Sequence, residues 1–450
     1  MQHTTAPAQP WIPRQSRPET AAHVADLLAA YRPGGSWFLS TPRGALLARG
    51  VRASVPATGD TPLRQRVAET LRSARAAGAD HPIVIGAVPF DPDDREHPPH
   101  LVVPASVQRA LPLPVDEWPT GRRPLTNPAD PANRATPANP GNPVPGEAAG
   151  GGWLVTPDPA PEVYRAAVAE AVRRMGAGEL EKVVLSRSLR LEPAGGPGTA
   201  PLDLPRMLRA LARRDPGGHT FAFDLPARAH HGATGPRAYP GPRTLIGASP
   251  ELLVSRHGTT LTANPLAGSI ARATDPAEDH ARGQRLLASA KDRHEHAVVI
   301  RSITEALSPL CAELDVPAEP SLLRTATMWH LSTRITGRLA DRTVSSFDLA
   351  CAMHPTPAVC GRPTDRARRL IGELEPFERG WFTGMVGWCD ADGDGEWIVT
   401  IRCAEAERDS LRLFAGAGIV VGSDPDAELA ETSAKFRTFL LAAGVERPLD

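Results

Sequence analysis

The C-terminal part of the chain constrains the fold most strongly. Strand-like runs at 381–389, 396–404 and 410–415 follow one another with short turns between them, and a helix is expected over about 426–443. Strands that are joined by short turns favour antiparallel sheet, with helices covering its apolar face. The pattern therefore predicts an α+β fold.

Earlier segments contain elements of the same kinds. Residues 36–50 are typical of two short strands around a turn, and 81–90 of a buried strand that Pro89 closes. Helical spacing over 161–176 leads into a β-rich run at 181–191. These elements extend the α+β pattern towards the N-terminus.

Two stretches are too poor in large apolar residues to form a core. From about 113 to 152 the sequence is dense in Pro, Gly, Asn and Ala, so we expect a mobile insertion or linker. Residues 226–243 interrupt a strand-like region at 220–262 and are expected to lengthen a hairpin loop. The length of 450 residues alone leaves one large domain or several smaller ones open.

Composition argues against several classes of partner. The 50 Lys and Arg residues nearly balance 51 Asp and Glu residues, so a formal charge of -1 provides no global field for nucleic acid or an anionic membrane. The five cysteines form no CxxC pair, which indicates free thiols in a reducing compartment. We see no basic segment followed by an apolar core at the N-terminus and no run of about 18 apolar residues, and therefore expect a cytoplasmic location.

Glu428, Glu431 and Lys435 form the first candidate site. Their spacing of three and four positions puts them on one face of the C-terminal helix, where two carboxylates and a lysine can meet one ligand. Such a trio is more often a solvated face with salt bridges. The preceding GAGIVVG at 416–422 favours a site, because a small-residue turn after a strand leaves backbone N–H groups free to face an anion.

Two acidic segments match metal-binding motifs only in part. Residues 278–310 predict one long helix, on which Glu295 lies in KDRHEHA, but HEH lacks the four-residue histidine spacing of a zinc site. DADGDG at 390–395 begins like a calcium loop, yet Ile401 stands where the loop needs a bidentate glutamate. We interpret the second segment as a hairpin turn.

Single polar residues beside strand-like runs are further candidates. Lys182 opens an apolar strand, and the ordinary interpretation is a lysine that reaches the surface. If it is buried instead, desolvation lowers its pKa and makes it a possible general base. Glu251 in GASPELL, Arg402 in TIRCA and His330 in MWHLST could equally be core or rim residues with local hydrogen bonds.

Taken together, eight segments occur in a recognisable order. They are EKVVLSR (181–187), GASPELL (247–253), PLAGS (265–269), KDRHEHA (291–297), TMWHLST (327–333), HPTPAVCG (354–361), GWCDADGDGEWIVTIRCA (387–404) and GAGIV (416–420). In this order they resemble the chorismate-utilising enzymes, and within that family the isochorismate synthases. Relatives include salicylate synthases and component I of anthranilate and aminodeoxychorismate synthases. The resemblance is dense over about 155–443 and thinner in the N-terminal part.

The resemblance implies a single α+β domain over residues 1–450. In the family, two antiparallel sheets form a layered α/β sandwich with helices packed outside and the active site in a central cleft. Within this domain we expect an N-terminal part at 20–112, the insertion at about 113–152, and the motif-bearing catalytic part at 153–445.

The resemblance also implies an activity, in which water adds at C2 of chorismate while the C4 hydroxyl leaves, giving isochorismate. Lys182 matches the lysine that deprotonates water, and Glu251 matches the acid that protonates the departing hydroxyl. Arg402 would pair with the enolpyruvyl carboxylate, and the Gly418 N–H would add a second donor. Further positions expected to line the substrate site are Ala267, Gly268, Ser269, His330 and Lys435.

Magnesium is the cofactor that the resemblance implies. Glu295 and Glu431 match its ligands, with Glu428 helping directly or through water, and the ion would hold the ring carboxylate of the substrate. The product would feed siderophore (2,3-dihydroxybenzoate), salicylate or menaquinone-type biosynthesis. We expect a monomer without a glutaminase subunit.

Two positions separate hydration from amination. Lys182 stands where ammonia-using relatives carry Gln, because water needs a base at neutral pH whereas ammonia is already a nucleophile. Ala267 stands where aminodeoxychorismate synthases carry a nucleophilic Lys. A salicylate synthase, which also eliminates pyruvate, stays open as an alternative, as does a non-catalytic relative that only binds chorismate.

Overall fold

The computed structural model describes residues 23–112, 152–196, 198, 202–226 and 243–445. The predicted insertion and the predicted long hairpin loop fall, apart from their end residues, outside this part of the chain. Among the described helices, none combines the length and the apolar character needed to cross a membrane.

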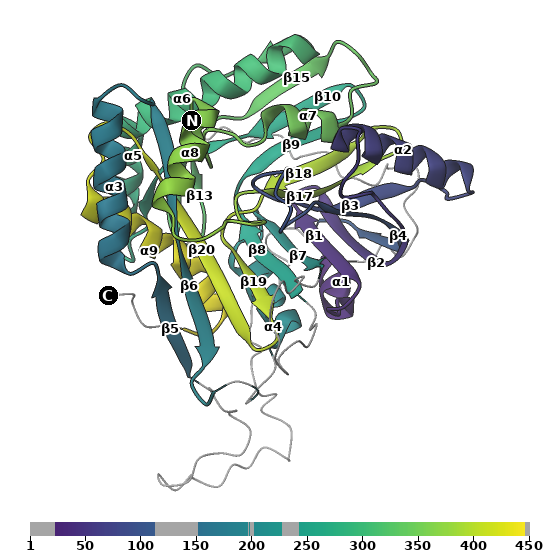
Figure 1. The fold of residues 1–450 in the computed structure, drawn as a ribbon, viewed down its shortest axis with the longest axis horizontal. Coiled ribbons are helices and arrows are strands. Elements are labelled where there is room, and N and C mark those ends of the chain that lie inside the picture. The colour runs from purple at the N-terminus through teal and green to yellow at the C-terminus, as the bar shows by residue number, and fades with distance from the viewer. Residues whose placement is uncertain (1–22, 113–151, 197, 199–201, 227–242, 446–450) are drawn as a thin grey trace, which may run out of the picture.

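Runs of consecutive strands are separated by single helices or helix pairs, as the α+β prediction requires (Figure 1). The predicted helices at 161–176 and 426–443 are confirmed by α3 and α9, and the β-rich run at 181–191 is confirmed by β6. The helices are α1 Val24–Ala30, α2 Leu63–Ala76, α3 Pro161–Gly176, α4 Leu204–Arg214, α5 Pro276–Ala288, α6 Ala290–Leu307, α7 Ser346–Met353, α8 Thr364–Leu374 and α9 Pro425–Ala442, with the 3-10 helix η4 at Ser308–Leu310.

The strands are β1 Ser36–Thr41, β2 Gly44–Ser54, β3 Ile83–Val88, β4 His100–Ala110, β5 Trp153–Asp158, β6 Lys182–Pro193, β7 His219–Leu225, β8 Arg243–Ser249, β9 Leu252–His257, β10 Thr260–Asn264, β11 Leu266–Ala271, β12 Cys311–Asp315, β13 Ser321–Arg324, β14 Met328–Ser332, β15 Ile335–Leu339, β16 Gly361–Arg362, β17 Met385–Asp390, β18 Gly395–Val399, β19 Cys403–Glu407 and β20 Ser410–Ile419.

Nearly all of these strands belong to one antiparallel sheet, which contains 17 strands within the described residues. Its hydrogen-bonded order is β5, β6, β20, β19, β8, β7, β1, β2, β4, β3, β17, β18, β9, β10, β15 and β12, with β16 on the free edge of β6. Strands β11, β14 and β13 form a separate three-stranded sheet. The antiparallel α+β prediction is therefore confirmed, but one continuous sheet replaces the two packed sheets that the resemblance implied.

The order of pairing shows that the large sheet curls back on itself. Strands β8 and β9 follow one another along the chain, separated by Pro250 and Glu251, yet they lie at distant places in the sheet. The same holds for β18 and β19, which Thr400, Ile401 and Arg402 connect. The chain crosses between the two halves of the sheet at both points, and each crossing carries a predicted site residue.

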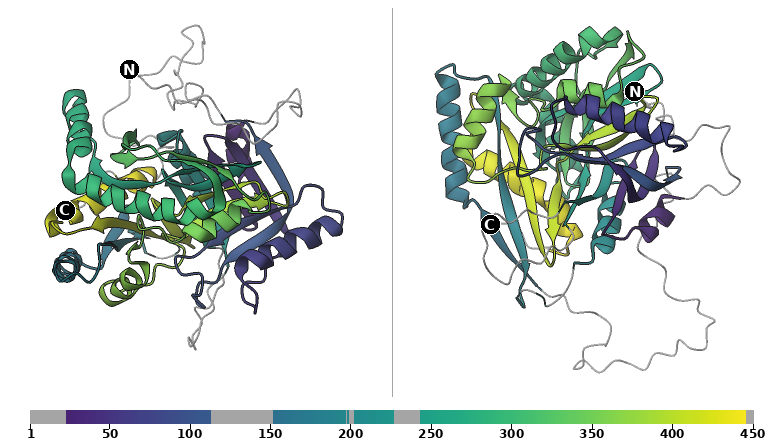
Figure 2. Two further views of the ribbon diagram at one scale, coloured as in Figure 1. Left: turned by 90° about the horizontal axis from the view of Figure 1, so that it is seen from above. Right: turned by 45° about the vertical axis from the view of Figure 1, so that its right-hand side comes forward.

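Helices cover the outside of the curled sheet (Figure 2). Helix α9 packs on β20 and α3, and α8 packs on β6, whereas α6 packs on β11 of the small sheet. The apolar face of α9 presents Phe436, Phe439 and Leu440 to a core cluster that also contains Leu189 and Leu413 of the sheet. This packing holds the other face of α9, which carries Glu431 and Lys435, in place beside β20.

Two predicted elements are wrong in detail. The long helix at 278–310 is interrupted at Ser289, whose backbone is extended (ψ 115°) and whose Oγ caps α6 by accepting the N–H of Asp292 at 3.2 Å. Ser289 followed by Asp292 is an N-cap signature that the spacing of apolar residues does not reveal. The strand-like run at 396–404 is likewise divided, because β18 and β19 lie on either side of residues 400–402.

The predicted small-residue turn lies later in GAGIVVG than expected, at Val421 and Gly422. Gly416 and Gly418 belong to β20, where they pair with Ser186 and Val184 of β6. The N-terminus of α9 is instead capped by the Asp424 carboxylate, which accepts the N–H of Ala427 at 2.9 Å. Glycine at these two positions therefore lets neighbouring side chains lie close to the backbone of β20.

Candidate active site

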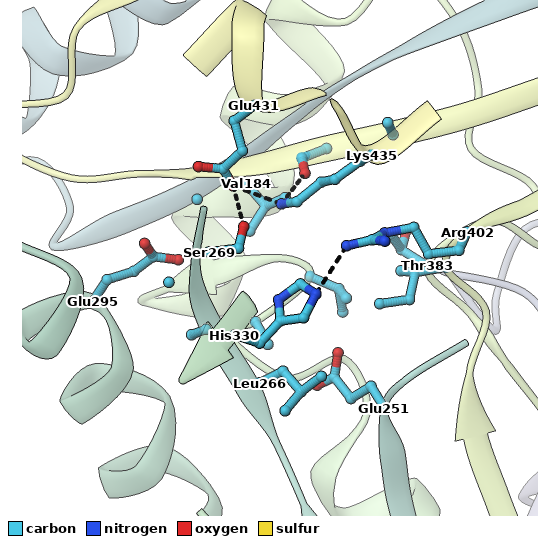
Figure 3. Close-up of a pocket in the computed structure, with 18 of the residues that line it drawn as sticks. Val184, Glu251, Leu266, Ser269, Glu295, His330, Thr383, Arg402, Glu431 and Lys435 are labelled. Carbon is cyan, nitrogen blue, oxygen red and sulfur yellow. Dashed lines mark hydrogen bonds and ion pairs between the residues drawn. The ribbon is translucent and has the colours of Figure 1, made fainter. Parts of the chain in front are cut away.

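A cavity lined by strands of both sheets and by helices α6 and α9 brings most of the predicted residues together (Figure 3). It encloses about 610 Å³ of empty space, the open solvent at its mouth included. Ten of the twelve predicted residues line it, all except Lys182 and Glu428. The predicted lining residues are Glu251, Ala267, Gly268, Ser269, Glu295, His330, Arg402, Gly418, Glu431 and Lys435.

Lys182 lies directly behind this wall. Its side chain is fully buried, and Nζ is 2.9 Å from Oε1 of Glu295 on α6. The angle of this contact falls outside hydrogen-bond geometry, so Nζ has no hydrogen-bond acceptor among the described residues. A buried lysine nitrogen without a hydrogen-bond partner is uncommon unless a ligand or water completes it. The surface lysine of the ordinary interpretation is thus excluded for Lys182.

Gly418 is required where Lys182 meets Glu295. A Cβ at position 418 would lie 2.1 Å from Oε1 of Glu295 and 2.9 Å from Cε of Lys182. The N–H and C=O of its partner Val184 bond to Cys360 and Arg379 on the edge of β6 away from β20. The pair is therefore of the non-hydrogen-bonded kind, and the N–H of Gly418 points away from β6 and towards α9.

Each of the three predicted metal ligands faces a lysine. Besides Glu295 and Lys182, Glu428 receives Nζ of Lys291 at 2.6 Å, and Glu431 receives Nζ of Lys435 at 2.7 Å. Glu431 also accepts the hydroxyl of Ser269 at 2.8 Å. The structure thus ties α6, α9 and the PLAGS segment together through charge.

These three lysines are the only lysines in the 450-residue sequence. Every other basic side chain, except the histidines, is an arginine. An ammonium is a compact, flexible point charge that can lose its proton when buried, whereas a guanidinium is planar and permanently charged. All three lie in or beside this one site, a concentration that charge counting did not separate from arginine.

The carboxylates of α9 repel one another. Burial, followed by the charge of Glu431, raises the pKa of Glu428 to about 7 against the opposing effect of Lys291. Burial also raises the pKa of Glu431, but Lys435 and Ser269 more than offset this, so its pKa is lowered overall. Two buried carboxylates in such competition are a donor set that a hard divalent cation stabilises. The residues present therefore fit magnesium.

The geometry does not gather all three predicted ligands at one point. In the described part of the chain, the only group of three metal-type ligand atoms within 4.8 Å of one another is Asp94, His97 and Glu378, none of which lines the cavity. The lysines lie beside the carboxylates instead. The assignment of Glu295, Glu428 and Glu431 as metal ligands accordingly stays a prediction.

Arg402 and His330 form the other end of the cavity (Figure 3). Nη2 of Arg402 donates to Nε2 of His330 at 3.0 Å, which places the histidine proton on Nδ1. Burial, with the charges of Arg402 and Lys435, lowers the pKa of His330 well below its usual value, so the ring is neutral. A neutral imidazole can hold the arginine without cancelling its charge.

The charge of Arg402 is left uncompensated by direct contact. Its side chain is buried and donates only to His330 and, at 3.4 Å, to Thr438, and no carboxylate of the described residues lies within ion-pair distance. Burial lowers its pKa to about 10. Its backbone also adopts φ 51°, a conformation that non-glycine residues rarely use. A buried, unpaired guanidinium held in this way is a site for an anionic group.

Glu251 is a buried carboxyl group suited to donate a proton. It lies at the crossing from β8 to β9, and burial raises its pKa to about 7. The backbone N–H of Leu266 and the charges of Lys182, Lys435 and Arg402 oppose this rise. A large fraction of Glu251 is therefore protonated near neutral pH, as general acid catalysis requires.

The PLAGS segment is held from behind by a residue that the motifs did not single out. Nδ1 of His296 donates to the carbonyl of Ala267 at 3.2 Å, and its Nε2 then accepts from Thr333 at 2.8 Å. Gly268 has φ 79°, and a Cβ there would lie 3.0 Å from Cβ of Asp292. These contacts set the position of Ser269 beside Glu431.

Several lining residues were not predicted. Some lie inside quoted motifs but were not singled out, Phe382 and Thr383 belong to the segment between 375 and 387, which carried no recognised motif, and Ala415 directly precedes GAGIV. They are Val184, Leu266, Ala358, Val359, Phe382, Thr383, Ile401, Ala415 and Gly416.

Comparison with known protein families matches residues 152–444 to the family described as chorismate binding enzyme. The match covers more than half of the chain. The protein belongs to the chorismate binding enzyme family. The resemblance carried by the eight motifs is thereby confirmed.

Individual members of the family are similar over nearly the whole chain. The isochorismate synthase DhbC of Bacillus subtilis (strain 168) is 48% identical over 431 residues, which cover 95% of this chain and 98% of that protein. A crystal structure of the 2,3-dihydroxybenzoate-specific isochorismate synthase DhbC from Bacillus anthracis covers 94% of this chain and 100% of its own, with 42% identity and a TM-score of 0.79.

A more distant structure shares the fold. MenF, the menaquinone-specific isochorismate synthase from Escherichia coli, has a TM-score of 0.70 at 24% identity, covering 94% of this chain and 92% of its own. Together with the structural match at 42% identity, this confirms the chorismate-utilising enzyme fold, with a large curled antiparallel sheet.

Proposed function

We propose that this protein is an isochorismate synthase, which adds water at C2 of chorismate while the C4 hydroxyl leaves. The observation that carries the proposal is the pairing of two groups across one cavity. Glu251 has a pKa raised to about 7 at one side, and the only fully buried lysine, Lys182, lies with unused donors behind the other. An acid and a base on opposite sides match a displacement in which one oxygen enters as another departs.

In this proposal Lys182 takes the proton of the attacking water and Glu251 gives its proton to the departing hydroxyl. The N–H of Leu266 orients the Glu251 carboxyl group. Because Gly418 has no side chain, Lys182 has room beside the cavity. Lys182 and Ala267 argue against amination. Ammonia-using relatives carry Gln at the first position, and aminodeoxychorismate synthases carry a nucleophilic Lys at the second.

Arg402 would bind the enolpyruvyl carboxylate. Its guanidinium is held by the neutral His330 and keeps N–H groups for a planar, two-point contact. The N–H of Gly418 points towards the same side of β20 as the carbonyl of Gly416, which accepts Nζ of Lys435 at 2.8 Å. Lys435 and this N–H are therefore available to the polar groups of the substrate.

Magnesium would be held by Glu295 and Glu431, with Glu428 directly or through water. When bound, it would supply positive charge that neutralises these carboxylates and holds the ring carboxylate of chorismate. The lysines would keep the remaining carboxylate oxygens in place, and Ser269 would orient Glu431 through its 2.8 Å hydrogen bond.

The product would enter 2,3-dihydroxybenzoate (siderophore) biosynthesis, a proposal that the similarity to DhbC proteins supports. We further propose that one chain suffices for activity, because the residues that line the cavity all belong to a single chain.

The test is to incubate the purified protein with chorismate and magnesium, without ammonia, and to identify the products by chromatography and mass. Isochorismate without pyruvate, lost when EDTA is added, is the expected result. Equal amounts of salicylate and pyruvate would make the protein a salicylate synthase. No conversion would overturn the proposed catalysis and favour a chorismate-binding protein.

A further inference from the structure

The edge of β6 next to the cavity lacks a neighbouring strand over four residues. One edge pairs with β20 from Val183 to Leu191. On the other edge, β16 pairs with residues 182–183 and β5 pairs with 188–193, so residues 184–187 lie in a gap. Lys182 lies at one border of this gap. Unpaired backbone groups in a buried sheet are costly, so another group has to satisfy them.

A buried ion pair fills the gap. Oε1 of Glu375, directly after α8, accepts the N–H of Ser186 at 2.7 Å, and Nη2 of Arg379 donates to the carbonyl of Val184 at 2.7 Å. The two side chains bond to each other at 2.8 and 2.5 Å, and each is 2% exposed. The pair thus continues the hydrogen bonding that a strand would have provided.

The same guanidinium reaches two more segments of the cavity wall. Nη1 donates to the carbonyl of Val359 at 2.7 Å and to the hydroxyl of Thr383 at 3.3 Å. Val184, Val359 and Thr383 all line the cavity. All five N–H donors of Arg379 are therefore used, and every acceptor outside the ion pair belongs to this wall.

Thr383 is the member that most needs support. It is buried with φ 58°, and a β-branched residue in this region is strained by about 1–3 kcal/mol. Its N–H bonds to the carbonyl of Thr400, two residues before Arg402, at 2.8 Å. The contacts of Arg379 thus connect the β6 wall to the crossing that carries Arg402.

We propose that the Arg379–Glu375 pair is a positioning unit for catalysis, which fixes the wall formed by Val184, Val359 and Thr383 and thereby the placement of Lys182 on β6. The inference rests on the proposed isochorismate synthase activity. Neither side chain touches the cavity, so the pair acts through the groups that it holds. Lysine cannot replace Arg379, because an ammonium has three donors at one point whereas four acceptor groups surround the planar fork.

Arg379→Lys and Glu375→Gln test the proposal with chorismate as substrate. The matched control is Arg243→Lys, since Arg243 and Glu405 form another buried arginine–glutamate pair at 2.7 Å and neither residue lines the cavity. We expect Arg379→Lys to lower kcat roughly 100-fold, with little change in KM, as for an ångström-scale misplacement. Arg243→Lys should keep kcat near that of the wild type.

Chemical rescue separates positioning from general stability. Millimolar guanidinium should restore part of the kcat of Arg379→Ala, whereas equal ammonium should not. A second measurement uses the three lysines of the chain, because mass spectrometry after acetylation gives the acetylation rate of each lysine separately. Lys182 should be acetylated faster in Arg379→Ala than in the wild type, while Lys291 should be unchanged; equal acceleration of both would mean general loosening and would overturn the proposal.

Two further outcomes would overturn the proposal. One is a wild-type kcat in Arg379→Lys, and the other is an equal loss in Arg243→Lys. If the single variants do not fold, Arg379→Met combined with Glu375→Met removes both charges at similar volume and avoids a lone buried ion. Wild-type turnover in that folded double variant would also count against positioning. Failure of the wild type to convert chorismate would instead contradict the proposed function, and the Lys182 acetylation rates would still test the positioning.

Discussion

Near the end of the cavity formed by α6 and α9, Glu295, Glu428 and Glu431 each lie beside a lysine. At the other end Arg402 faces no carboxylate among the described residues (Figure 3). The first end balances its buried charge internally, through three ion pairs of 2.6 to 2.9 Å. The second holds its charge with the neutral His330 and a hydroxyl. The first end is therefore suited to exchange cations, and the second to accept an anionic group that arrives with the substrate.

The largest expected effect comes from Lys182, which belongs to the first end but whose proposed role is proton transfer. Lys182→Met should lower kcat by about 10²- to 10⁴-fold, the usual worth of a general base. Lys182→Arg keeps positive charge beside Glu295 but cannot give up a proton near neutral pH, so it should be equally impaired. Steady-state kinetics measure both variants, with circular dichroism to check folding. Substantial activity in Lys182→Arg would mean that charge, and not a base, is what the site needs.

Glu251→Gln should lower kcat somewhat less, by about 10²- to 10³-fold, because solvent can supply some of the missing proton. The wild-type kcat/KM should fall as pH rises through about 7, since the raised pKa of Glu251 makes its proton disappear there. The variant should lose this descending limb, which pH profiles of kcat/KM would reveal. An unchanged limb would assign the titration to another group.

The same pKa shift affects folding in a defined direction. The folded state holds the Glu251 proton more tightly than the unfolded state, so its contribution to stability falls as pH rises from about 4.5 to about 7. Urea titrations of wild type and Glu251→Gln across this range should therefore converge towards low pH and separate towards pH 7, with the variant relatively more stable at the higher pH.

Arg402→Lys tests the anionic end and should have a smaller effect. Losing the planar fork removes one or two charged hydrogen bonds to a carboxylate, about 1.5–3 kcal/mol, which lowers kcat/KM by about 10- to 100-fold, mainly through KM. The comparison between the two ends would be weakened if kcat alone changed. That result would mean that binding of the substrate's carboxylate does not depend on Arg402.

The sequence identifies the residues of both ends better than it identifies their surroundings. Motif order placed ten lining residues in advance, and helical spacing gave α3 and α9. Periodicity could not show that β8 and β9 lie far apart in one curled sheet, because strand pairing is set by long-range contacts. The N-cap at Ser289 was readable, but the apolar spacing across it concealed the break.

The supporting residues were missed for a related reason. Arg379 and Glu375 are an ordinary i, i+4 pair in sequence, and such pairs are usually solvated. Only the gap at the edge of β6 makes them important, and the gap depends on where β5 and β16 pair. The confinement of lysine to this site was visible in the sequence, yet it acquires meaning only when each ammonium is seen beside a carboxylate.

Lys291→Met should have the smallest effect and sharpen the comparison most directly, because it removes one cation from the end that balances its own charge. Glu428 is almost fully buried, whereas Lys291 is 34% exposed, so we expect a loss of about 1–2 kcal/mol in the free energy of unfolding, after solvent screening is allowed for. If this end exchanges cations as we propose, magnesium should recover more stability in Lys291→Met than in the wild type. Urea unfolding with magnesium and with EDTA measures this difference. The matched control is Arg293→Met, because Arg293 lies on the same helix as Lys291 and forms an exposed ion pair with Glu319. Equal magnesium effects in all three proteins would show that Lys291 does not occupy a position that a divalent cation can take over.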